Sequence, residues 1–122
     1  MTPPIFETCA ADTSVQALLG DGSAVRLYSF GEAPQGVQLP YATWAVGSGA
    51  PENYLGQAPD CDQITVHLDV FARTADTARE VRDALAAAIE GVAHVVSWDG
   101  EGRDTESRAY RISFTVDWIV RR

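Results

Sequence analysis

Two stretches of the chain alternate between apolar and polar residues with the period of two that is typical of a β-strand. They cover residues 63–73 and 108–120. The apolar face consists of Ile64, Val66, Leu68, Val70 and Ala72 in the first stretch, and of Tyr110, Ile112, Phe114, Val116, Trp118 and Val120 in the second. We therefore expect two amphipathic strands, the second reaching about 40 Å at the usual rise per residue.

Between these strands, residues 74–90 have the apolar period of an α-helix. Asp76 favours the helix N-terminus, and Gly91 supplies a C-terminal stop. The apolar stripe consists of Ala78, Val81, Leu85, Ala88 and Ile89. The matching patterns predict that this helix packs on the apolar face of a sheet that contains both strands.

The N-terminal segment is also predicted to be helical, ending at Gly20. Pro3 suits a first helical turn. Residues 12–14 compete for backbone hydrogen bonds, and Thr13 with Gln16 matches a capping box. One interrupted helix and two short helices both fit this pattern.

Shorter apolar runs complete the set of predicted elements. Strands are expected at residues 24–30, 41–47 and 93–98, with loops at 31–40, 48–62 and 99–107. The order is then α-β-β-β-α-β-β. This order predicts an α+β fold, with an antiparallel sheet of four to five strands and two helices packed on one face.

Length and charge narrow the class of protein. A chain of 122 residues has the size of one domain, so we expect residues 1–122 to form a single domain. The net charge is −8 and every basic residue is Arg. Such acidity disfavours binding to nucleic-acid phosphates, but it suits a surface past which DNA moves without sticking. The sequence contains neither a signal peptide nor an apolar run of about 18 residues, so no membrane partner is expected.

The side chains that could carry chemistry are few. Cys9 and Cys61 are predicted to be free thiols, since they are far apart and lack CxxC spacing. His67 and His94 have no neighbours at the spacing of metal ligands. Residues 99–104 are rich in carboxylates but lack the spacing of a calcium loop, and we expect a solvated hairpin tip. We expect no catalytic residues, no cofactor and no metal.

The aromatic residues exceed what one small sheet face can bury. Trp44 and Phe71 are expected in the core, whereas Tyr41 and Trp98 have no assigned place.

The long segment 48–62 is the most unusual part of the chain. It is predicted to be a long loop or the irregular tip of a hairpin, entered through a bulge or turn at residues 47–49. Loops of this length are commonly functional, and an apolar pair in a polar loop suits contact with a partner. The predicted interface residues are Glu52, Tyr54, Leu55, Asp60 and Asp62.

The succession of segments resembles that of a known family. The segments that carry the resemblance are VQALLG at residues 15–20, APQG at 33–36, LPYATW at 39–44 and ITVHLDVFAR at 64–73. The last of them leads into an Ala- and Arg-rich helix. Over nearly the whole chain this is similar to the tail-completion (tail-terminator, or tail-to-head joining) proteins of long-tailed bacteriophages. These segments correspond to strands, loops and helix ends, and none of them is a catalytic motif.

This resemblance implies a virion structural protein of a phage or prophage, assembled in the host cytoplasm. Such proteins form a ring, generally a hexamer, on the head-proximal end of the tail tube. The implied partners are further copies of the chain, the major tail tube protein and the head-completion or connector protein. DNA would pass through the lumen without specific binding.

Two other classes of protein remain compatible with the sequence. One is a different small α+β component of a tail tube or contractile-injection system, which would polymerise into long tubes and not into closed rings. The other is a small enzyme or ligand-binding domain with a cleft between sheet and helices, which would have a specific small-molecule ligand.

Overall fold

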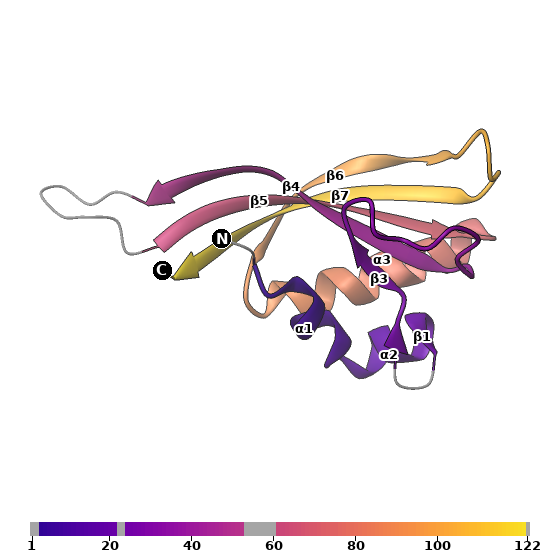
Figure 1. Ribbon diagram of the computed structural model, residues 1–122, viewed down its shortest axis with the longest axis horizontal. Coiled ribbons are helices and arrows are strands. Elements are labelled where there is room, and N and C mark those ends of the chain that lie inside the picture. Colours follow the sequence, from indigo (N-terminus) through magenta and orange to yellow (C-terminus); the bar gives the residue numbers. More distant parts are fainter. Residues whose placement is uncertain (1–2, 22–23, 53–60, 122) are drawn as a thin grey trace, which may run out of the picture.

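A computed structural model of the protein describes residues 3–21, 24–52 and 61–121. Helices and strands form an α+β arrangement, as predicted, with α3 as the one helix between the two groups of strands in the described chain (Figure 1). The elements are α1 (Ile5–Ala10), α2 (Thr13–Leu19), β1 (Gly20–Asp21), β2 (Ala24–Val25), β3 (Leu27–Ser29), β4 (Tyr41–Glu52), β5 (Cys61–Ala72), α3 (Ala75–Glu90), β6 (His94–Arg103) and β7 (Tyr110–Arg121).

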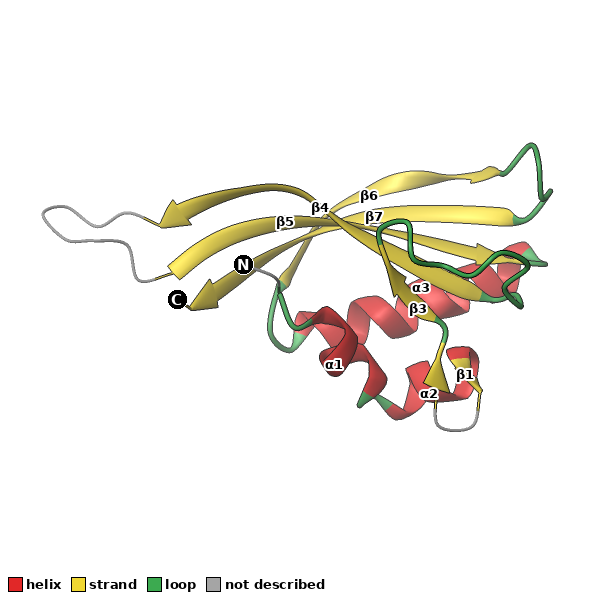
Figure 2. Cartoon of the chain, viewed as in Figure 1, coloured by secondary structure: helices red, strands yellow, loops and turns green. Residues whose placement is uncertain are grey.

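One five-stranded sheet, in the order β3-β4-β5-β7-β6, organises the molecule. Figure 2 shows α1, α2 and α3 together on one face of it. The predicted class, strand number and one-sided helical layer are therefore confirmed, and the N-terminal region contributes two short helices to this layer.

The centre of the sheet is the antiparallel pair β5 and β7, which remain in register from Cys61↔Arg121 to Ala72↔Tyr110. The predicted apolar faces of both strands point toward the helices. The stripe of β5 is buried throughout, and in β7 the buried residues are Ile112, Phe114, Val116 and Trp118. The alternation of residue types therefore determines which face meets the core.

Helix α3 covers this apolar face. The Thr74 hydroxyl accepts a hydrogen bond from the Thr77 N–H and caps the first turn, and the helix ends before Gly91. Its buried residues are Ala78, Val81, Leu85, Ala86 and Ile89. The predicted packing of Val81, Leu85 and Ile89 on the sheet is confirmed.

The N-terminal segment forms two short helices, which was one of the two predicted alternatives. The break occurs at Asp12, whose carboxylate accepts hydrogen bonds from the N–H groups of Ser14 and Val15. Asp12 is therefore the N-cap of α2, and the predicted capping role of Thr13 is wrong. An aspartate one residue earlier reaches the free N–H groups of the first turn directly.

The strand predicted at residues 24–30 is correct in part, because an interruption at Arg26 divides it into β2 and β3. The Arg26 side chain is buried. Its guanidinium donates to the carbonyl oxygen of Pro40 at 2.8 Å, and to those of Gly20 and Leu18 at 3.5 Å each. This side chain ties the end of α2 to the residue that precedes β4.

The pairing of β3 with β4 corrects the expectation of a purely antiparallel sheet. These two strands run parallel, with Leu27 opposite Ala42 and Ser29 opposite Trp44. The connection over residues 30–40 is long enough to return the chain to the starting end of β3. The other pairings of the five-stranded sheet are antiparallel.

Strand β4 is longer than predicted. It continues through Glu52, which pairs with Cys61 at the start of β5, so much of the predicted loop 48–62 is strand. The register shifts between Val46 and Ser48, which confirms the bulge expected near Gly47. Gly, Ser and Pro usually indicate turns, but the ladder to β5 overrides this local preference.

Strand β6 is also longer than predicted, reaching Arg103 in place of residue 98. Two register shifts place bulges at Val96 and Asp99. The predicted hairpin tip at residues 99–104 therefore lies mostly within β6, while β7 begins at Tyr110. Bulges allow a Gly- and Asp-rich sequence to form an edge strand, because each bulge leaves one residue unpaired and the ladder continues beyond it.

Candidate functional site on the open face and edges of the sheet

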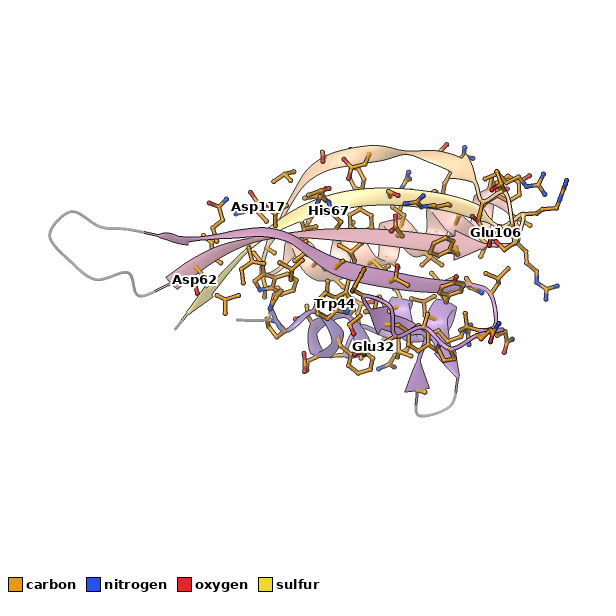
Figure 3. The ribbon with its side chains drawn as sticks, turned by 45° about the horizontal axis from the view of Figure 1, so that its top comes forward. Glu32, Trp44, Asp62, His67, Glu106 and Asp117 are labelled. Atoms are coloured by element: carbon orange, nitrogen blue, oxygen red, sulfur yellow. The ribbon has the colours of Figure 1, made fainter. Side chains whose placement is uncertain are left out.

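The face of the sheet away from the helices carries a network of polar side chains. Figure 3 shows two of them, His67 and Asp117, on this open face. The network comprises Gln63, Thr65, His67 and Asp69 of β5, Ser97 and Asp99 of β6, and Arg111, Ser113, Thr115 and Asp117 of β7. Along β5 and β7 the buried apolar residues face the helices, and the polar residues between them make up most of this network.

At one end of the network, Asp117 accepts two hydrogen bonds from β5. The Gln63 amide donates to Oδ2 at 2.9 Å, and the Thr65 hydroxyl donates to Oδ1 at 3.0 Å. Cross-strand neighbours thus hold the carboxylate in one orientation.

In the middle of the network, Asp99 accepts from the hydroxyls of Ser97, at 2.6 Å, and Thr115. These bonds, the one from Ser97 first, lower the pKa of Asp99 below its usual value, and the charge of His67 acts in the same direction. The Nδ1 atom of His67 lies 2.9 Å from the Thr115 oxygen. Because the Thr115 proton points to Asp99, this oxygen accepts from an Nδ1–H of His67.

At the other end, Asp69 accepts from the Ser113 hydroxyl and from the Arg111 guanidinium. The Arg111 Nη2 atom lies 3.1 Å from the carboxylate, and both side chains are partly exposed. Of the three carboxylates in the network, this is the one that pairs with an arginine.

A hollow of about 650 Å³ lies above this part of the open face, lined by His67, Asp69, residues 99–105, Arg111 and Ser113. The carboxylates in it already have protein donors, so hydrogen bonds hold them in place. Among the described residues, no group of three His, Cys, Asp or Glu side chains could hold a metal ion. The arrangement presents fixed negative charge to whatever faces the sheet.

The edge strand β6 carries exposed apolar side chains on the same molecule. Val96 is 51% exposed and Trp98 is 58% exposed. The Trp98 ring lies on the helix side, 5.7 Å from the ring of Phe114, and the Arg82 guanidinium lies 5.5 Å from its centre. Farther along β6, Glu101 accepts two hydrogen bonds of 3.0 Å from Arg79 of α3, and these bonds lower the pKa of the Glu101 carboxyl group.

The opposite margin of the sheet is only partly covered. Strand β3 pairs with β4 over Ala42–Trp44, so in the described chain Ala45–Glu52 has no strand on its outer side. Val46 is 48% exposed at this margin, and Phe30, directly after β3, is 80% exposed. Each margin of the sheet therefore combines a free strand edge with exposed apolar side chains.

Two of the predicted interface residues lie in described parts of the chain. Glu52 is the last residue of β4, and Asp62 lies opposite Pro51 near the start of β5, where it is half-buried (Figure 3). Tyr54, Leu55 and Asp60 fall outside the described residues. The described ends of β4 and β5 project well beyond the helical layer (Figure 1).

The expectation for the aromatic residues is correct in part. Trp44 packs against the core, as predicted. Phe71 does not: it faces the open side, where its ring stacks on that of Tyr41 with centroids 4.8 Å apart. The alternation of β5 places residue 71 opposite the buried stripe, and this signal outweighs its hydrophobicity.

Sequence reasoning missed the open-face network and the apolar margin of β6. The signal for the network was present, because Asp69 and Asp117 occupy polar positions of the two alternating strands. Asp99 could not be placed, since its position depends on the two bulges of β6.

Comparison with known proteins gives the class of this protein. Residues 3–121 match the family described as tail completion protein gp17. The chain therefore belongs to this family of bacteriophage tail-completion proteins, and the resemblance found in the sequence is confirmed. It is a structural component of the phage tail and hence of the virion.

A solved structure has the same fold. A chain in the structure titled "Virion of native gene transfer agent (GTA) particle" superposes with a TM-score of 0.59 at 15% identity, covering 97% of this chain and 92% of that one. At this identity the likeness shows the fold alone. No curated protein matches the chain. No helix in the described residues is long and apolar enough to cross a membrane.

Proposed function

We propose that the protein forms a closed ring, in the virion a hexamer, on the head-proximal end of the tail tube. The ring stops growth of the tube and presents the surface that joins the tail to the head connector. The observation that carries this proposal is the family match over residues 3–121. The two unlike free margins of the sheet are consistent with this family membership.

The two margins support ring formation. A closed ring requires heterologous contacts, in which one patch of a subunit meets a different patch of its neighbour. Strand β6 is at one end of the sheet order, and β4 lies next to the short β3 at the other end, so each subunit offers two different surfaces.

The open face of the sheet suits the lumen of such a ring. It carries the fixed carboxylates of Asp69, Asp99 and Asp117, and among the described side chains Arg111 is the one arginine in its hydrogen-bond network. Negative charge repels DNA phosphates, so DNA passes without being retained. The chain as a whole has the same sign, with a net charge of −8.

The β4–β5 hairpin is the proposed contact with a neighbouring subunit or with the major tail tube protein. Its described ends project past the helices, and Glu52 and Asp62 lie there (Figure 1). Tyr54 and Leu55 supply apolar residues to this contact, and Asp60 adds charge. Assembly takes place in the host cytoplasm, before filled heads are joined.

Complementation of a phage that lacks this gene tests the proposal. Without the protein we expect filled heads and tails that are unjoined, or tails of uncontrolled length. Normal infectious particles from the deletion would contradict the function.

The same system tests the hairpin. A Tyr54→Ala, Leu55→Ala double variant should fold but fail to restore joined particles, whereas the control Phe6→Ala, which trims an exposed apolar side chain on α1, should restore them. Full rescue by the double variant would remove the hairpin from the interface and leave the family function intact. Misfolding of the isolated double variant would instead assign the hairpin to the core.

A further inference from the structure

We propose that the two margins of the sheet bind each other in neighbouring copies of this chain. The outer edge of β6 in one subunit adds to the free edge of β4, Ala45–Glu52, in the next subunit. This inference rests on the proposed ring and names the contact that closes it.

The strand directions allow this contact. In the series β4-β5-β7-β6, each strand is antiparallel to its neighbour. Strands β4 and β6 therefore run in opposite directions. When a second copy places its β6 beside β4, the antiparallel alternation continues across the boundary. Addition of a strand to an exposed edge satisfies backbone N–H and C=O groups that the isolated chain leaves to water.

Both margins have a free edge of useful length in the described chain. Strand β3 pairs with Ala42–Trp44 of β4 and leaves Ala45–Glu52 open on that side. Strand β6 has 10 residues and pairs with β7 on its inner side. A two-fold contact between two β6 edges would leave both β4 edges open, whereas a head-to-tail contact uses both margins of every subunit.

The apolar side chains at the two margins lie on the same face of the sheet. Val46 lies opposite Val66, and Trp98 lies opposite Phe114, and both of these partners are buried under the helices. Val46 and Trp98 are nevertheless 48% and 58% exposed, because they extend past the helical layer on opposite sides. Joining the margins places both side chains on one face of the seam, where they exclude water from it.

On the other face of the seam, Ser97 of β6 is polar, and the β4 side presents the small residue Ala45 next to the polar His67 of β5. Ala45 lies opposite His67 on the open face, and Thr115, which lies next to His67, pairs with Ser97 of β6. A continuous sheet therefore keeps the large apolar side chains of both margins on the helix side of the boundary. The bulges at Val96 and Asp99 make the β6 edge irregular, which disfavours pairing with unrelated strands.

Two matched substitutions test the contact, since each disables one margin. Val96→Lys places a charge at the β6 margin, and Val46→Lys places the same charge at the β4 margin. The control is Phe6→Lys, on α1 in the helical layer, where the side chain is 43% exposed. Circular dichroism checks that each variant folds, and Trp98→Lys serves as a second β6 variant.

The expected result is specific to a head-to-tail contact. The unaltered chain and the control form rings, seen by native mass spectrometry and by electron microscopy at tail-tube ends, whereas each margin variant alone stays monomeric. A mixture of the two variants, one of them labelled with nitrogen-15, forms a one-to-one heterodimer and nothing larger, since it retains one intact β6 margin and one intact β4 margin.

Rings formed by either margin variant would overturn the proposal. So would a mixture that stays monomeric at concentrations several-fold above those at which the unaltered chain forms rings. Both outcomes would contradict the proposed contact between the margins and would leave the proposed ring function intact. An unaltered chain that forms no ring, alone or on tail tubes, would instead contradict the proposed function.

Discussion

At the scale of single residues, the position of His67 shows how the open face is fixed. A Cβ atom added to Gly47 would lie 2.2 Å from Nε2 of His67, so this imidazole occupies the space that a side chain at residue 47 would need. Its other nitrogen contacts Thr115, which donates to Asp99. The bulge at Gly47 and the carboxylate of Asp99 are therefore linked through one histidine.

Replacing Gly47 with Ala should displace the His67 ring and break its contact with Thr115. We expect a loss of about 1–2 kcal/mol in the free energy of unfolding, from crowding and one lost hydrogen bond. In a His67→Ala background the same change should cost less than about 0.5 kcal/mol, since the space is then free. Urea unfolding of the four proteins measures the coupling, and equal costs in both backgrounds would contradict the described contact.

Cys9 is predicted to be an unreactive thiol in the folded protein. Burial, with a smaller contribution from the Asp12 carboxylate, raises the pKa of Cys9 to about 12. At pH 8 only about one molecule in ten thousand then carries the thiolate. Iodoacetamide without reductant should leave Cys9 unmodified in the native protein and should modify both Cys9 and Cys61 in denaturant. Two unmodified cysteines in denaturant would contradict the prediction of free thiols.

The same pKa shift gives the sign of a pH effect. Because folding raises the pKa of this thiol, the native state holds its proton more tightly than the unfolded state. The resulting stabilisation is complete below the unfolded pKa and is lost as the pH rises toward 12.

At the scale of elements, the amphipathic segments follow from residue pattern alone. The stripes of β5, β7 and α3 are regular, and each one meets the core as expected. Leu85 is a clear case, with 1% of its surface exposed between α3 and the sheet.

Replacing Leu85 with Ala should lower the free energy of unfolding by about 2–5 kcal/mol, since it leaves a cavity in the core. The control Glu80→Ala, at an exposed position of the same helix, should change it by less than about 0.5 kcal/mol. Chemical denaturation measures both. A change at Leu85 as small as that at Glu80 would show that the helix does not pack on the sheet.

Elements that depend on pairing could not be predicted in full. Residues 48–52 are predicted as part of a long loop because Gly, Ser and Pro have low strand preference, yet the ladder to β5 makes them part of β4. The parallel pairing of Leu27 with Ala42 depends on where the chain returns after residues 30–40, which no local pattern specifies. The same holds for Asp99, whose place in the open-face network is set by a bulge.

At the scale of the whole molecule, one sheet separates two environments. The helices bury one face (Figure 2), and the open face carries hydrogen-bonded carboxylates. The two margins remain free to meet neighbours. This asymmetry suits a ring whose inner surface faces DNA, because lumen, seam and outer surface then correspond to different parts of one fold.

Electron microscopy of the purified protein, alone and mixed with growing tail tubes, tests the central claim most directly. We predict closed six-fold rings, attached to one end of each tube, and tubes that stop lengthening once the ring is bound. Long tubes built by the chain itself, or binding along the length of preformed tubes, would contradict a terminating ring.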